Sequence, residues 1–65
     1  MAKVVVQEKP AEREGLVGSF KRFGPHGVAY QVVKVDDDEF ATIRVVESGE
    51  TLEYPIRKIL ADPAA

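Results

Sequence analysis

Three turn sequences interrupt the chain after Leu16 and leave only short segments between them. The turns are Gly24-Pro25-His26-Gly27, Asp36-Asp37-Asp38 and Glu47-Ser48-Gly49-Glu50. Glycine, proline, aspartate and serine favour tight turns, whereas the segments between are rich in β-branched and aromatic residues, which favour strands. These segments span residues 16–23, 28–35, 39–46 and 51–54. The pattern predicts a mainly β domain, a small antiparallel meander.

A short helical turn is predicted after the last strand, from Pro55 to Leu60. Proline is tolerated at the first helical position, and Ile56, Ile59 and Leu60 recur at helical spacing, so one apolar stripe can pack onto the sheet. A strand that enters such a turn closes the open end of many SH3-like barrels. We therefore predict one SH3-like half-barrel domain over residues 16–65.

The predicted strands carry apolar residues on both faces. In the second segment, strict alternation sets Ala29, Gln31, Val33 and Val35 against Val28, Tyr30, Val32 and Lys34. In the third, it sets Ala41, Ile43 and Val45 against Phe40, Thr42, Arg44 and Val46. Two-sided apolar strands suit either a sheet that curls on itself or one that faces a partner.

The first fifteen residues differ in their pattern of apolar and polar residues from the rest of the sequence. Val4-Val5-Val6 is followed by a polar, proline-broken stretch, so residues 1–15 form either a flexible arm or an edge strand that pairs with another chain. A chain of 65 residues has a thin core, and with no cysteine it has no disulfide to support it. We therefore expect a homodimer or a protein partner, and a reducing, cytoplasmic setting. No segment approaches the roughly 20 apolar residues of a membrane span, so no membrane partner is expected.

The acidic residues and the single histidine, which in other proteins often bind metals or act in catalysis, are explained here as turn residues. The acidic run of residues 36–39 lacks the alternating ligands and the glycine of a calcium loop, so we interpret it as a solvated turn. His26 lies between turn residues and has no nucleophile near it in the sequence. We predict no catalytic residue, no metal, no cofactor and no enzymatic activity.

One candidate binding surface combines aromatic rings with cations. Nucleic-acid-binding modules stack bases on aromatic rings and follow the phosphate backbone with cations. The net charge of −2 is an argument against this role, and Phe20 and Phe23 also suit a core. The candidate residues are Phe20, Lys21, Arg22, Phe23, Tyr30, Lys34 and Arg44.

Two resemblances add to these observations. Residues 18–32, with Ile43-Arg44-Val45-Val46-Glu47-Ser48-Gly49-Glu50 and Tyr54-Pro55, resemble a family of small proteobacterial proteins of unknown function, and the likeness covers roughly residues 16–63. The order of strands before Tyr54-Pro55 is also similar to the SH3-like fold of the type II dihydrofolate reductases. Their Val-Gln-Ile-Tyr active-site strand reads Thr51-Leu52-Glu53-Tyr54 here, so the resemblance does not extend to the activity.

Two functions remain after these exclusions. The first hypothesis is a small protein-interaction or regulatory module, for example an operon partner or an antitoxin-like inhibitor, that docks through a sheet face or an edge strand. The alternative is an SH3-like nucleic-acid-binding module that uses the aromatic and basic residues named above.

Overall fold

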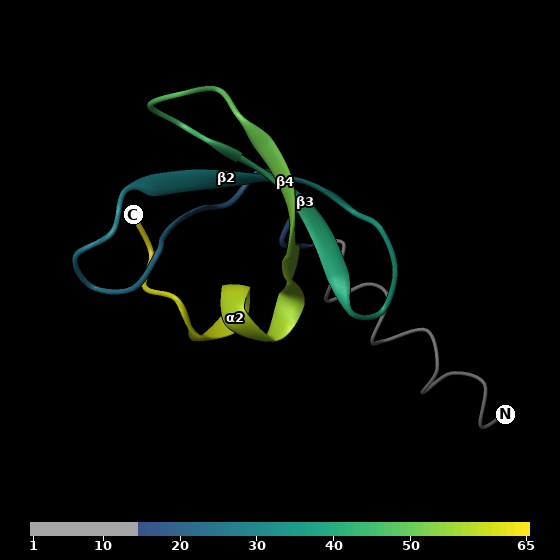
Figure 1. The fold of residues 1–65 in the computed structure, drawn as a ribbon. Coiled ribbons are helices and arrows are strands. Elements are labelled where there is room, and N and C mark those ends of the chain that lie inside the picture. Colours follow the sequence, from purple (N-terminus) through teal and green to yellow (C-terminus); the bar gives the residue numbers. More distant parts are fainter. Residues whose placement is uncertain (1–14) are drawn as a thin grey trace, which may run out of the picture.

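The computed structural model describes residues 15–65, which form a four-stranded antiparallel sheet followed by a short helix (Figure 1). The strands are β1 (Phe20–Arg22), β2 (Ala29–Val35), β3 (Phe40–Val45) and β4 (Thr51–Pro55), and the helix is α2 (Ile56–Ala61). The strands are neighbours in chain order. The predicted meander and the helical turn after it are confirmed. The predicted arm, apart from Gly15, lies outside the described residues.

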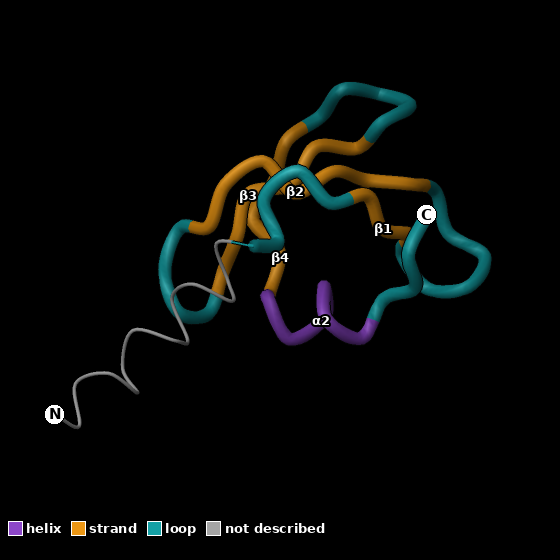
Figure 2. Tube along the Cα trace, turned by 180° about the vertical axis from the view of Figure 1, so that it is seen from behind, coloured by secondary structure: helices purple, strands orange, loops and turns teal. Residues whose placement is uncertain are grey.

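The core lies between α2 and one face of the sheet, which we call the inner face; the opposite one is the outer face. Figures 1 and 2 show α2 on one side of the strands. Six side chains are buried there: Tyr30, Val32, Ala41, Ile43, Ile56 and Ile59. Burying a valine or isoleucine side chain stabilises a fold by about 1.5–3 kcal/mol, so the larger members of this cluster contribute substantially to the stability of the sheet.

A β-bulge in β2 corrects the predicted alternation. Tyr30 and Val32 lie opposite Val45 and Ile43 of β3, but the register shifts between Val32 and Lys34. Val35 consequently lies opposite buried Ala41 and packs against the core, on the same face as Val32. The prediction that grouped Val35 with Gln31 is wrong, because the extra residue of a bulge reverses the faces beyond it.

The first strand is shorter than predicted. Residues 15–18 form a turn instead of a strand, in which the Ser19 N–H donates to the Leu16 carbonyl at 2.9 Å. Gly18 has a φ of 93°, a left-handed conformation that glycine adopts without the steric cost of a Cβ. The turn places Leu16 against the core, so this leucine acts as a cap on the sheet.

The C-terminal residues pair with the free edge of β1. The Arg22 N–H donates to the Pro63 carbonyl and the Ala65 N–H donates to the Phe20 carbonyl, both at 3.0 Å, and Lys21 and Ala64 form a bridge. Figure 2 shows the C-terminus beside β1. This pairing satisfies backbone groups that an edge strand otherwise leaves exposed.

The helix buries only part of the predicted stripe. Pro55 is the N-cap, with a ψ of 133°, rather than the first helical residue, so it ends β4 and starts α2. Ile56 and Ile59 are buried, but Leu60 is 64% exposed. In the part of the chain that the structure describes, no helix is long and apolar enough to cross a membrane.

Candidate functional site

Asp62, just after α2, is the residue on which the most side-chain hydrogen bonds converge. Its Oδ2 accepts from the hydroxyl of Tyr30 at 2.7 Å and from that of Tyr54 at 3.1 Å, and its Oδ1 accepts from the Gly24 N–H at 3.2 Å. Its main-chain carbonyl accepts from Lys21 Nζ at 3.1 Å. The carboxylate therefore joins the end of α2 to β2, to β4 and to the turn after β1.

The two tyrosines belong to an aromatic cluster with Phe23. The Phe23 ring centroid lies 4.5 Å from that of Tyr30 and 5.3 Å from that of Tyr54, and the tyrosine rings are 5.4 Å apart. Tilted and edge-on contacts at these distances are favourable. Burial, and then the hydrogen bond to Asp62, raises the pKa of the Tyr30 hydroxyl far above its ordinary range. The same two causes, in the same order, raise the pKa of Tyr54.

This arrangement holds the end of α2 against the sheet through hydrogen bonds. The Asp62 carboxylate already accepts three hydrogen bonds, and a tyrosine whose pKa is raised keeps its proton at neutral pH and is a poor base. Among residues 15–65, no group of three or more histidine, cysteine and acidic residues is arranged to hold a metal ion.

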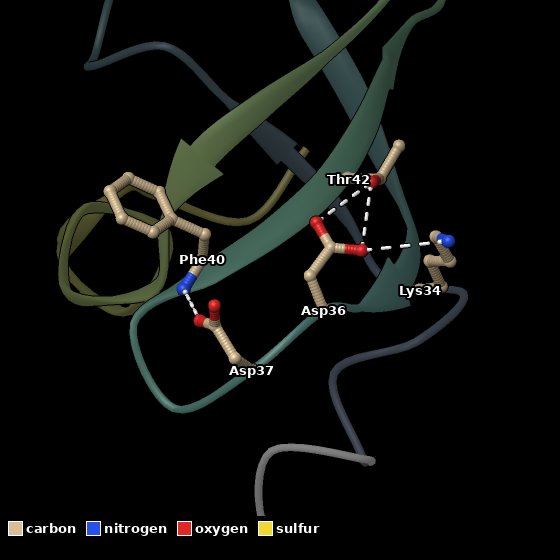
Figure 3. Close-up of polar contacts among 5 residues, drawn as sticks. All are labelled: Lys34, Asp36, Asp37, Phe40 and Thr42. Atoms are coloured by element: carbon tan, nitrogen blue, oxygen red, sulfur yellow. Dashed lines mark hydrogen bonds and ion pairs between the residues drawn. The ribbon is translucent and has the colours of Figure 1, made fainter.

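The acidic run forms the turn between β2 and β3, as predicted (Figure 3). Asp37 Oδ1 accepts from the backbone N–H groups of Glu39 and Phe40, both at 2.8 Å, and these bonds lower the pKa of the Asp37 carboxyl. Asp36 accepts from the Thr42 hydroxyl at 2.9 and 3.1 Å and lies 3.7 Å from Lys34 Nζ. The side chains of Asp36 and Asp37 therefore stabilise this hairpin through hydrogen bonds within the turn and to β3.

A groove of about 410 Å³ lies where this turn meets the junction of β4 and α2. Its apolar lining comes from Phe40, Pro55, Ile56 and Leu60, and Asp38, Glu39 and Arg57 supply its charged residues. Leu60, on the last turn of α2, leaves 64% of its surface exposed here. A leucine so exposed beside an apolar hollow offers surface that a binding partner can cover.

The predicted binding residues divide between the two faces of the sheet. Lys21 and Phe23 turn toward Asp62 and the aromatic cluster, and Tyr30 is fully buried, so none of these three joins a surface on the outer face. The outer face carries the other four, all exposed: Phe20, Arg22, Lys34 and Arg44. The seven residues therefore do not form one surface.

A cross-strand row organises this outer group. Phe20 lies opposite Gln31, Gln31 lies opposite Arg44, and Arg44 lies opposite Thr51, so four neighbouring strands each contribute one side chain. Gln31 was not among the predicted binding residues. Strand pairing places it on the same face as its neighbour Phe20, but the sequence alone does not reveal the register of the two strands.

Asp62 was also missed by the sequence analysis. An aspartate at the C-terminal end of a helix is unfavourable for the helix dipole, so its position between Ala61 and Pro63 is a local mismatch. An unfavourable local position of this kind indicates that tertiary contacts stabilise the residue, but the sequence does not show which contacts they are.

The comparison with known families covers nearly the whole chain. Residues 5–65 match the model of a family of unknown function, DUF5397. The chain belongs to this family. The predicted resemblance to a family of unknown function is thereby confirmed, and the match extends beyond residues 16–63 to residues 5–15 and 64–65. No curated protein matches the chain.

Proposed function

We propose that the chain is a small, non-enzymatic protein-interaction module of SH3-like architecture, and that it binds a partner protein through the groove beside Leu60. The observation that carries this proposal is the exposure of Leu60, 64% of whose surface faces solvent at the edge of an apolar hollow. Covering an exposed leucine side chain contributes about 1.5–3 kcal/mol to an interface, enough to make it an anchor residue.

The groove also indicates the chemistry of the partner. Its volume of about 410 Å³ is large enough to accept one bulky side chain. Asp38 and Glu39 give the groove two acidic groups against the single cation Arg57. We therefore expect a partner segment with a bulky apolar side chain that enters the groove and a lysine or arginine next to it.

The test compares two substitutions that each introduce a glutamate at an exposed apolar position. Leu60→Glu changes the groove, whereas Val46→Glu changes a residue that is 54% exposed and follows β3, outside the groove lining. Tagged full-length protein captures partners from cells that express it naturally, and the affinity of each captured protein is then measured with purified components. Circular dichroism confirms that both variants are folded.

The proposal predicts that Leu60→Glu weakens binding of a captured protein at least about tenfold, or about 1.4 kcal/mol, whereas Val46→Glu leaves it unchanged. If the partner is a second copy of the chain, the solution mass of the wild type is that of a dimer and Leu60→Glu converts it to a monomer. Equal binding by the wild type and Leu60→Glu would show that the groove is not the docking site.

A further inference from the structure

The outer face of the sheet carries three cations, only one of which takes part in an ion pair among residues 15–65. Arg22, Lys34 and Arg44 are all exposed on this face. The one ion pair among residues 15–65 joins Lys34 to Asp36, so the two arginines have no carboxylate within salt-bridge distance in that range. Free guanidinium groups on a sheet face are suited to bind phosphate oxygens.

An exposed aromatic ring lies in the same row as one of these cations. Phe20 is 47% exposed, although a phenylalanine on a small domain is ordinarily a core residue. Strands in a sheet are about 4.8 Å apart, so Gln31 separates Phe20 from Arg44 by about 10 Å in total. The amide of Gln31 adds hydrogen-bonding groups between the ring and the guanidinium.

Acidic groups are concentrated away from this row. Four of the acidic residues of the described part form the turn after β2, and Glu47 and Glu50 belong to the turn between β3 and β4. On the outer face, Asp36 lies beside Thr42 and Lys34, and Glu53 of β4 lies opposite Thr42, one row away from Arg44. The net charge of the whole chain is −2, whereas the row of Phe20, Gln31, Arg44 and Thr51 contains one arginine and no acidic residue.

We propose that this outer face binds single-stranded nucleic acid, with a base stacked on Phe20 and phosphate groups held by Arg22 and Arg44. The combination of a phenyl ring with two arginines favours nucleic acid over other anions, because a simple polyanion has no planar group that can stack on the ring. Single strands present unstacked bases, whereas the bases of a duplex are stacked and paired. This surface shares no residue with the groove lining, so the proposal does not rest on the partner protein proposed above.

Fluorescence anisotropy of labelled oligouridylate and oligothymidylate with the full-length protein tests this proposal. Binding is measured over a series of salt concentrations, because each phosphate neutralised in a single strand contributes about −0.7 to the slope of log affinity against log salt. If each of the two arginines neutralises one phosphate, the slope should be about −1.4 or steeper. Arg44→Ala is expected to make the slope less steep by about 0.7.

Two further variants separate base stacking from general charge. Phe20→Ala is expected to weaken binding about tenfold, since stacking of one base contributes about 1–3 kcal/mol. Arg57→Ala removes the same charge from α2, and its affinity should remain that of the wild type. Phe20 is exposed and lies outside the core cluster, so Phe20→Ala should fold, which circular dichroism confirms.

Three results would overturn the proposal. The first is no anisotropy change at low salt. The second is an equal loss of affinity in Arg44→Ala and Arg57→Ala, which would mean that net charge alone drives binding. The third is binding that competes fully with inorganic polyphosphate and is unaffected by Phe20→Ala, which would assign an anion-binding role without base recognition.

Discussion

Replacing Asp62 with alanine should destabilise the whole domain, because this carboxylate joins four segments of the chain. Hydrogen bonds to a charged group contribute about 1.5–3 kcal/mol each, and Asp62 accepts three through its side chain. Water can replace the carboxylate at Tyr54 and Gly24, which are partly exposed, but not at the fully buried Tyr30. We therefore expect Asp62→Ala to lower the free energy of unfolding by about 3 kcal/mol.

This loss is large for so small a protein. A chain of this length has a total stability of about 3–10 kcal/mol, and the slope of that stability with urea is about 1 kcal/mol per molar. The urea midpoint of Asp62→Ala should therefore lie about 3 M below that of the wild type. If the wild-type stability is near the lower end of this range, the variant should be partly unfolded without urea. Circular dichroism during a urea titration measures this midpoint directly.

The control is Asp38→Ala, which removes an exposed carboxylate from the turn after β2 and should leave the midpoint unchanged. A double-mutant cycle with Tyr30→Phe should give a coupling energy of about 1–2 kcal/mol, because both single substitutions break the 2.7 Å bond. A loss below about 1 kcal/mol for Asp62→Ala would refute the reasoning, since it would mean that the buried Tyr30 hydroxyl does not depend on this carboxylate.

Two other predictions concern pH and a tight turn. The raised pKa of Tyr30 means that the folded chain keeps a proton that the unfolded chain loses, so stability is retained below about pH 10 and falls as the pH rises above it, by up to about 1.4 kcal/mol per pH unit. Urea midpoints measured across this range should fall less steeply in Tyr30→Phe, and an identical slope would contradict the assignment. Gly27→Ala should cost about 1–3 kcal/mol, because a Cβ there would overlap the Phe23 carbonyl, whereas His26→Ala in the same turn should leave the midpoint nearly unchanged.

The strands were predictable because their signals are local. Turn residues separate β-branched segments at each hairpin, and the meander follows from their order. The bulge was not predictable, because Val32 and Val33 are both valines and either of them can face the core. The register beyond that point depends on contacts with Ala41, which the local pattern does not contain.

The candidate sites were only partly predictable, because they depend on contacts between distant segments. Phe20, Arg22 and Arg44 were identified by residue type, but their position on one face follows from strand pairing. Tyr30 looked equally suitable for that surface, and its burial depends on Asp62, 32 residues further along the chain. Leu60 fitted the helical stripe, but a helix of six residues covers only the part of the sheet beneath Ile56 and Ile59.

The pairing of the C-terminal residues with β1 has a consequence for how the protein is made. Asp62 reaches Gly24 and Lys21 across 38 and 41 residues, and the Ala65 N–H bonds to Phe20, so these contacts form only after almost the whole described sequence has been synthesised. Contacts of such long sequence separation slow folding. A nascent chain that ends before Asp62 carries Tyr30 without its acceptor and β1 with an open edge, a state prone to pair with other chains. A chain truncated before Asp62 should therefore be more sensitive to protease than the chain that includes residues 62–65.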